Sequence, residues 1–283
     1  MILYKVCTEV SLSQIYNAFC RGFADYSIPF HLSEDEFFAH FFGLEGNELK
    51  YSFIALDNEN PVGLILGGTR VFDCMKTMRC GAFCIAPDYR KKGIGRELFQ
   101  LHQAAAKEAG CKQLFLEVLK SNHRAIQFYE KAGYRISVIL KYYHKKTSEL
   151  SVPKEIPPYK ITSIRFDVVK GFREKLNTCH INWQSDIFCY EDSKTDIFYG
   201  VYDDYQLIAL TAISTKGKIN FLWVEPSYRF KGIGRFLLHQ ASKQVESESL
   251  YVCIPGNALL EGFFRKLEFE KDTLEQYEMY LPL

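Results

Sequence analysis

The chain alternates between stretches of helical periodicity and short apolar stretches of strand character. Apolar residues recur at about every fourth position from Ser13 to Ala24, which predicts an amphipathic helix. A capping box at Ser33–Glu36 predicts the start of a second helix, which we expect to run through Phe42. Helices therefore come first in this half of the chain.

The rest of the first half predicts a meander of strands followed by alternating strands and helices. Strands are expected at Tyr51–Asp57, Val62–Thr69, Arg79–Ala86, Leu114–Leu119 and Tyr134–Lys141, and helices at Gly95–Ala109 and His123–Ala132. This order of elements predicts an α+β (mixed α/β) domain, with helices first, then an antiparallel meander, then alternating strands and helices.

The chain contains an internal repeat. Pro87–Arg96 and Pro226–Arg235 are identical at eight of ten positions. A second matching pair, an Asn followed six positions later by a Phe, begins at Asn122 and at Asn257. Matches this far apart are typical of a duplicated domain, not of a short solenoid repeat.

A polar, proline-containing stretch separates the two copies. His144–Pro153 lacks apolar periodicity, and Pro157 and Pro158 follow shortly after. Such composition is typical of a linker. We expect a first domain at 1–146, a linker at 147–157 and a second domain at 158–283.

Composition narrows the class of protein. With 283 residues, 47% hydrophobic and 24% charged, the chain suits two ordinary globular domains. A net charge of +1 gives no reason to expect a nucleic acid or membrane partner. The nine cysteines show no paired spacing, so we expect reduced thiols, no metal and a cytoplasmic location. We also expect no signal peptide and no membrane span.

The repeated segment contains a glycine loop between a strand and a helix. Gly93 and Gly95 allow a ligand to approach the backbone closely, and the helix N-terminus presents unpaired amides. The positive side chains of the loop are Arg90, Lys91, Lys92 and Arg96. Together these features predict a diphosphate site.

Other phosphate loops fit less well. Arg96 follows Gly95 where a P-loop needs Lys, and Leu98 stands where a dinucleotide fingerprint needs a third small residue. A basic turn with no ligand is the alternative, and the recurrence of the loop in the same context weighs against it.

With a helix following it, the string V-x-P-x-x-R-x-x-G-x-G resembles motif A of the GNAT acetyltransferase superfamily. Ile85–Pro87 and Val224–Pro226 stand at its first three positions. Leu116–Val118, Asn122 and Phe128–Tyr134 resemble the motif that follows. The resemblance implies two tandem GNAT folds, each a central mixed, mostly antiparallel sheet flanked by helices, with acetyl-CoA as co-substrate.

The resemblance also implies where coenzyme A binds in the first copy. Loop amides would hold the pyrophosphate, and the strand before the loop would pair with the pantetheine arm. The implied cofactor residues are Cys84, Ile85, Ala86, Arg90, Lys91, Lys92, Gly93, Ile94, Gly95, Arg96, Asn122 and Tyr129. Asn122 has an equally good alternative, as the N-cap of the helix that begins at His123.

Acetyl transfer to an ammonium needs a base, and the departing thiolate benefits from an acid. In the ribosomal-protein alanine acetyltransferase branch of the family, a Glu in the L-E-V strand is the base and a Tyr twelve residues later is the acid. Glu117 and Tyr129 stand at those positions. The alternatives are a Glu117 paired with Lys or Arg and a Tyr129 that fills the core. Asp73 is a second candidate base, and His102 is expected to face solvent.

The aromatic-rich stretch 37–42, together with Tyr26 and Phe30, suits either the wall of an apolar acceptor site or a helix core. The second copy lacks the proposed acid and base, because Phe264 and Val252 stand opposite Tyr129 and Glu117. Glu268 also stands opposite Gly133, which predicts a different helix ending.

These features predict an N-acetyltransferase that moves acetyl to a small-molecule or peptide amine by direct transfer in a ternary complex. The second domain is expected to be degenerate, and the chain to act as a monomeric pseudo-dimer or a homodimer. The rival functions are a non-catalytic coenzyme A sensor and a tandem acyltransferase similar to mycothiol synthase.

Overall fold

The computed structural model describes every residue except 27, 29, 152–157, 177–178, 192 and 194. Its contacts divide the chain into two compact units. The first comprises Met1–Val118, Asn122–Ser137 and Glu278–Leu283, and the second comprises Leu119–Ser121 and Val138–Tyr277. The predicted boundaries at 146 and 158 follow the polar stretch, whereas these contact units change at 118/119, 121/122, 137/138 and 277/278. Most of the predicted linker, 152–157, lies outside the described residues.

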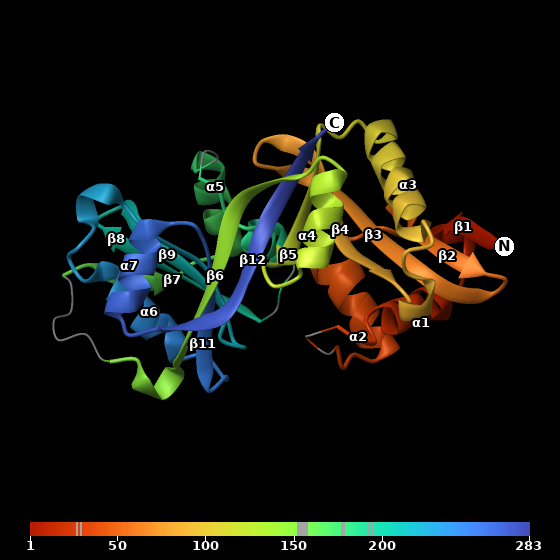
Figure 1. Cartoon of the computed structure of the whole chain (residues 1–283). Helices are drawn as coiled ribbons and strands as arrows, with labels where there is room; N and C mark the ends of the chain where they lie inside the picture. Colours follow the sequence, from red (N-terminus) through yellow and green to blue (C-terminus); the bar gives the residue numbers. More distant parts are fainter. Residues whose placement is uncertain (27, 29, 152–157, 177–178, 192, 194) are drawn as a thin grey trace. The chain divides into compact units, whose positions relative to one another are not determined.

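The first unit contains most of the predicted elements (Figure 1). They are β1 (Ile2–Val6), α1 (Leu12–Gly22), α2 (Glu34–Phe38), β2 (Phe53–Asp57), β3 (Asn60–Phe72), β4 (Met75–Ile85), α3 (Ile94–Glu108), β5 (Gln113–Leu119), α4 (His123–Lys131) and the start of β6 (Arg135–Lys146).

Two elements near the N-terminus differ from the sequence prediction. The strand β1 was not predicted, and it pairs antiparallel with β2 from Ile2↔Asp57 to Val6↔Phe53. Ser33 caps α2 as predicted, with both bonds of the capping box present. The helix is shorter than predicted, because a π-helix at Ala39–Leu44 takes the place of its predicted last part.

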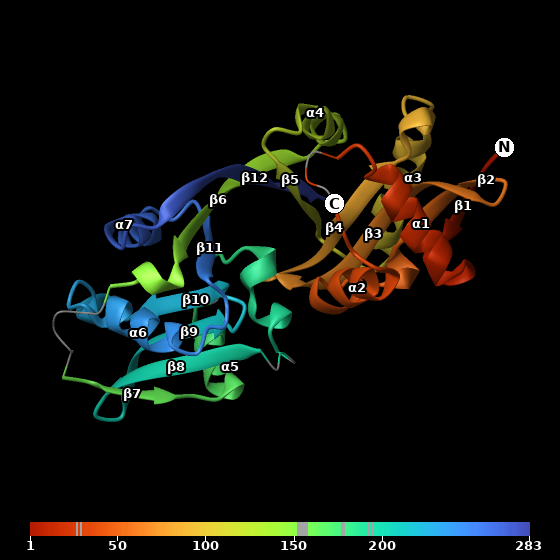
Figure 2. The ribbon, with the colours of Figure 1, turned by 90° about the horizontal axis from the view of Figure 1, so that it is seen from below.

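The sheet of the first unit has helices on both faces. β1, β2, β3 and β4 pair antiparallel in that order. Figure 2 shows α1 and α2 on one face of β3 and β4 and α3 on the other. The α1 face is packed by apolar residues such as Ile15, Phe19 and Leu64. The predicted mixed, mostly antiparallel sheet is confirmed.

The parallel pair β4 and β5 separates soon after it begins. The two strands pair only at Thr77↔Gln113, Met78↔Leu114 and Arg79↔Phe115. Beyond Arg79, β4 continues to Ile85 without β5 as its partner. The edge of β4 before the glycine loop is therefore available to an extended ligand, as the predicted splayed strand requires.

The second unit contains another helix-flanked sheet. Its elements are β7 (Lys160–Ser163), α5 (Phe166–Lys175), β8 (Asp196–Asp203), β9 (Gln206–Ser214), β10 (Ile219–Val224), α6 (Ile233–Ser242), β11 (Ser249–Pro255), α7 (Ala258–Lys266) and most of β12 (Glu270–Pro282). The strands β10, β9, β8 and β7 form an antiparallel sheet in that order.

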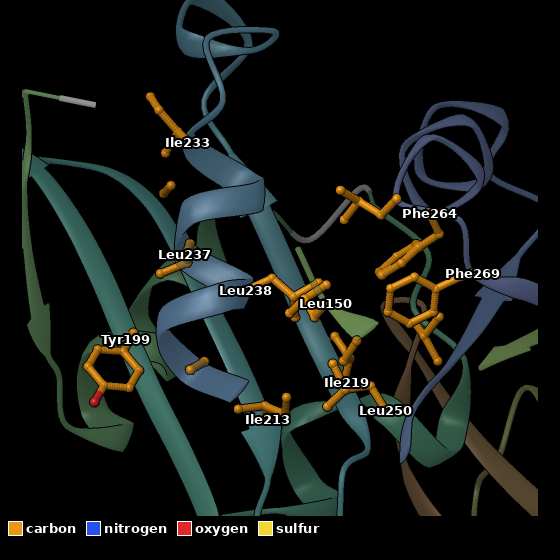
Figure 3. Packing of buried hydrophobic residues seen from close by; sticks show 14 of the residues in the cluster. Leu150, Tyr199, Ile213, Ile219, Ile233, Leu237, Leu238, Leu250, Phe264 and Phe269 are labelled. Atoms are coloured by element: carbon orange, nitrogen blue, oxygen red, sulfur yellow. The ribbon is translucent and has the colours of Figure 1, made fainter. Parts of the chain in front are cut away.

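Two hydrophobic cores cover the faces of this second sheet. Leu237 and Leu238 of α6 pack with Ile213 on one face, together with Phe264 and Phe269 (Figure 3). Another cluster, around Val169 of α5, covers the opposite face. The second copy is thus a packed α+β unit in its own right.

The end of β12 belongs to the first unit and lies next to β5 in its sheet. The Tyr280 ring lies 5.0 Å from the Phe115 ring, and the Tyr280 hydroxyl donates to Asp73 at 3.2 Å. The Leu283 amide donates to the carbonyl of Lys112 at 3.0 Å. The first unit is therefore completed by six residues from the far end of the sequence.

Candidate active site

The glycine loop of the first unit has the geometry of an anion site. Gly93 is the N-cap of α3 and adopts a φ of 85°, a region that favours glycine. Lys91 adopts a φ of 62°. In the described part of the chain, the backbone amides of residues 91–95 donate to no acceptor. These amides at the positive end of α3 fit a diphosphate.

The side chain of Arg90 holds the loop in place, which corrects its expected contribution to the positive charge. Its Nε donates to the Ile85 carbonyl at 2.9 Å, and its terminal nitrogens bond Asp25 at 2.5 and 2.6 Å. Because Asp25 balances the guanidinium, only the exposed side chains of Lys91, Lys92 and Arg96 leave positive charge at the loop.

The second copy shares several bonds of this loop. Arg229 Nε donates to the Val224 carbonyl at 2.9 Å, and Gly232 is the N-cap of α6 at a φ of 80°. Tyr228 donates to Asp203 at 2.7 Å, as Tyr89 does to Asp57 at 2.9 Å in the first copy. The loop geometry is thus a property of both units.

The remaining predicted cofactor residues lie in and after β4. The Cys84 thiol and the Ala86 side chain are buried, and the thiol faces the Ala18 carbonyl on α1 at 3.7 Å. Ile94 is buried in the first turn of α3. Around Cys84 and Ile85, it is therefore the backbone of β4, rather than a side chain, that faces the side where β5 has separated from β4.

Asn122 is the N-cap of α4, and its side chain accepts a hydrogen bond from the Ala125 amide at 3.2 Å. The capping role considered in the sequence analysis is confirmed. The cap fixes the start of the helix that carries Tyr129, so it also fixes where the Tyr129 hydroxyl lies.

Tyr129 lies in an aromatic, buried environment. Its ring is 6.3 Å from Phe83 on β4 and 5.6 Å from Tyr134, and the Cys80 thiol lies next to its hydroxyl. Burial raises the pKa of the Tyr129 phenol well above its usual range. The phenol therefore keeps its proton at neutral pH, as a general acid must.

Glu117 is held by an arginine that the sequence analysis did not identify as functional. Arg79 Nη2 donates to Glu117 at 2.6 Å, and Arg79 Nη1 donates to Glu45 at 2.7 Å. The side chains of Glu117 and Arg79 are 1% and 4% exposed. The alternative for Glu117, a carboxylate paired with Lys or Arg, is thus present. The sequence signal was a lone charge in an apolar strand, which needs a partner.

The expectation that His102 faces solvent is wrong. The ring is completely buried on α3, beside Gly67 of β3 and near the Tyr51 carbonyl. Neither ring nitrogen has a partner within hydrogen-bond geometry among the described residues, although the Tyr51 carbonyl lies close enough to favour the protonated ring. Burial lowers the pKa of His102 to about 4.

This burial makes stability depend on pH. His102 becomes protonated below pH ~6.5 in the unfolded chain but only below about 4 in the folded protein. The folded state therefore keeps its full stability above pH ~6.5 and loses stability as the pH falls from there toward 4. We expect a loss of about 2 kcal/mol between pH 7 and pH 5. In urea unfolding, His102→Met should remove this loss, and the exposed control His31→Met should keep it. An unchanged pH dependence in His102→Met would contradict the assignment.

The early aromatic residues mainly form a core. Phe37 and Phe41 are buried, and their rings pack at a tilt against Phe19 with centroid distances of 4.8 and 5.0 Å. Phe30 is 41% exposed, and Tyr26 stacks on it at 6.0 Å. Of the predicted acceptor wall, Phe30 is exposed, and Tyr26, Phe38 and Phe42 are half-buried.

In the second unit, apolar residues occupy the positions of the proposed acid and base. Val252 and Phe264 are buried in the core shown in Figure 3. The prediction of a different helix ending is wrong, because Glu268 adopts a φ of 60° where Gly133 adopts 100°. The second copy keeps the left-handed ending without the glycine.

In the described part of the chain, no group of three or more His, Cys, Asp or Glu side chains could hold a metal ion. Among the same residues, every helix is too short or too polar to cross a membrane.

Comparison with known proteins gives two family matches. Residues 12–134 match the Acetyltransferase (GNAT) family, and residues 180–283 match an Acetyltransferase (GNAT) domain. The "N-alpha-acetyltransferase 30" of Schizosaccharomyces pombe is 28% identical over 103 residues, covering 33% of this chain and 64% of that protein. The "[Ribosomal protein bS18]-alanine N-acetyltransferase" of Escherichia coli K12 is 35% identical over 63 residues, covering 22% and 43%. The matched segments span less than two thirds of these relatives.

Solved structures share the fold over the whole chain. A "Tandem GNAT protein from the clavulanic acid biosynthesis pathway" superposes with a TM-score of 0.66 at 12% identity, covering 100% of this chain and 98% of that one. A putative acetyltransferase from Pyrococcus horikoshii gives 0.66 at 13% identity, with 100% and 89% covered. At such identities the likeness concerns the fold alone.

Proposed function

Because this chain is a tandem of two domains of the GNAT acetyltransferase family, we propose that its first unit transfers an acetyl group from acetyl-CoA to a primary amine. Transfer is direct, within a ternary complex. The acceptor is a small-molecule or peptide amine, and the relatives named for N-terminal acetylation favour a peptide α-amine.

One observation carries this proposal. The amides of residues 91–95 are available at the N-terminus of α3, directly after a strand whose edge is released from β5 beyond Arg79. A diphosphate fits the first feature and an extended amide-containing arm fits the second. Coenzyme A carries a diphosphate followed by an amide-containing arm. The two features together therefore fit coenzyme A better than a simple anion, which would use only the first of them.

Two side chains of the first unit supply the proton chemistry. Glu117 on β5 accepts the proton of the acceptor ammonium, through water where the distance requires it. Tyr129 on α4 donates its proton to the departing thiolate, and burial keeps that proton in place until it is needed. Each such group typically contributes ~10²–10⁴-fold to the rate.

The second unit retains the loop but has Val252 and Phe264 at the catalytic positions. We propose that it does not catalyse transfer.

Release of free thiol from acetyl-CoA tests the activity. We expect an amine-dependent increase in rate with some member of a panel of peptide α-amines, amino acids, polyamines and aminoglycosides. The rival function, a coenzyme A sensor, predicts acetyl-CoA binding in calorimetry without amine-dependent release from any acceptor.

A further inference from the structure

The side chain of Arg90 reaches from the glycine loop of the first unit to the segment that follows α1. Its Nη1 and Nη2 atoms bond the two carboxylate oxygens of Asp25 at 2.5 and 2.6 Å, and Nη2 also donates to the Gly22 carbonyl at 3.2 Å. Two parallel bonds to one carboxylate fix the relative orientation of both side chains. Arg90 therefore holds the end of α1, and the turn after it, against the loop.

The loop itself does not require this acid, as the second copy shows. There, Arg229 keeps the bond from its Nε to the strand carbonyl, and the backbone is nearly the same, with a φ of 65° at Phe230 against 62° at Lys91. Arg229 lies over the Trp223 ring at 5.0 Å, and no acid among the described residues forms an ion pair with it. Asp25 is thus an addition of the first copy, and its role lies outside the shape of the loop.

The turn that contains Asp25 also places Tyr26 beside the proposed acid. The Asn122 side chain, at the start of α4, lies next to the Tyr26 hydroxyl. Burial chiefly raises the pKa of Tyr129, and the Tyr26 phenol is among the neighbouring groups that raise it further. Tyr26 is half-buried, so part of its ring remains available to a ligand.

We propose that Asp25 is a positioning residue that, through Arg90, keeps Tyr26 in place as the acceptor side of the site. The inference rests on the proposed function and extends it to a residue that touches neither substrate. Arg90 begins the loop and is also held by its bond to the Ile85 carbonyl, so the ion pair ties the Tyr26 turn to the place where coenzyme A binds. Loss of the tie displaces the acceptor side and leaves the loop as it is in the second copy.

The charges around Asp25 show how the tie can be broken. The bond from Arg90 chiefly lowers the pKa of Asp25, and Arg124 on α4 contributes. Two guanidinium groups therefore lie near this position. A positive side chain there would be repelled by both, whereas a neutral side chain of the same shape would only lose the ion pair.

Substitutions of Asp25 should raise the KM of the acceptor amine in a graded series. The Asp25 carboxylate is 53% exposed, so Asp25→Asn should raise this KM by ~2–5-fold, as expected for a solvent-screened pair. Asp25→Arg adds repulsion and should raise it further. Asp25→Glu keeps the carboxylate and should stay closer to the wild type than Asp25→Asn. The affinity for coenzyme A should change little in all three variants, and kcat should change less than the KM of the amine.

The experiment measures initial rates of thiol release with the best amine of the panel varied at saturating acetyl-CoA, and coenzyme A binding by calorimetry. Asp88→Asn is the matched control, because Asp88 is an exposed acid two residues before Arg90 and its loss makes the same change of charge near the loop. We expect a wild-type KM for the amine in this control. If Asp25→Arg does not fold, Asp25→Asn decides.

Three results would overturn the inference. The first is a wild-type KM for the amine in folded Asp25→Arg. The second is an equal rise in Asp88→Asn and Asp25→Asn, which would reflect charge alone. The third is a fall in coenzyme A affinity as large as the rise in the KM of the amine, because the ion pair would then serve the loop.

The same measurements separate this inference from the proposed function. Amine-dependent release by the wild type, together with an unchanged KM for the amine in Asp25→Arg, rejects only the role of Asp25. A wild-type protein without amine-dependent release from any acceptor rejects the proposed function, and the inference with it.

Discussion

Tyr129→Phe should lower turnover by ~10²-fold or more while acetyl-CoA binds with little change in affinity. The substitution removes only the hydroxyl, so the ring contacts with Phe83 and Tyr134 remain. What is lost is the proton for the departing thiolate. Steady-state kinetics and calorimetry with coenzyme A, measured on the same preparation, give the two quantities.

Tyr134→Phe is a close control for this variant. Tyr134 is also a buried phenol, its ring lies 5.6 Å from Tyr129, and its hydroxyl has no hydrogen-bond partner among the described residues. We expect turnover within a few-fold of the wild type. Equal losses in the two variants would mean that the hydroxyl of Tyr129 serves packing rather than proton donation.

Deletion of Glu278–Leu283 should unfold or severely destabilise the first unit and abolish transfer. These residues supply the strand next to β5 and the ring that contacts Phe115. Without them, the completely buried Phe115 becomes accessible. We expect a loss of at least about 3 kcal/mol, the usual effect of removing a large buried side chain.

Limited proteolysis and thiol release would measure the effect of this deletion. Tyr280→Phe is the control, since it removes only the hydrogen bond to Asp73 and should stay near wild type. A truncated protein with a wild-type cleavage pattern and activity would show that the first unit folds without the end of β12.

Local sequence signals predicted much of the fold. The capping box at Ser33, the glycine at the start of α3 and the Asn cap of α4 are all present as expected. These features are local, since each depends on a few neighbouring residues. The strand β1 was missed because its short segment lacks clear alternation, and the placement of β12 depends on pairing across the length of the chain.

Predicting the candidate site from sequence was less successful where charges meet across strands. Glu117 was identified from its motif, but its bonds to Arg79 depend on the register of β4 against β5. His102 was expected to face solvent because a helix position alone does not say which neighbour covers it. Arg90 was counted as ligand charge because Asp25, its partner, lies on a segment distant in sequence.

The most direct test of the central claim compares Gly93→Val with Gly232→Val in the thiol-release assay. The two glycines are matched, with φ of 85° and 80°, and a Cβ at either would meet nothing within 4 Å. Both substitutions therefore strain the backbone alike, and each places a side chain where a phosphate approaches the loop. We predict that Gly93→Val loses acetyl-CoA-dependent turnover and that Gly232→Val retains it within a few-fold. Turnover that survives Gly93→Val and disappears in Gly232→Val would place the chemistry in the second unit and contradict the account.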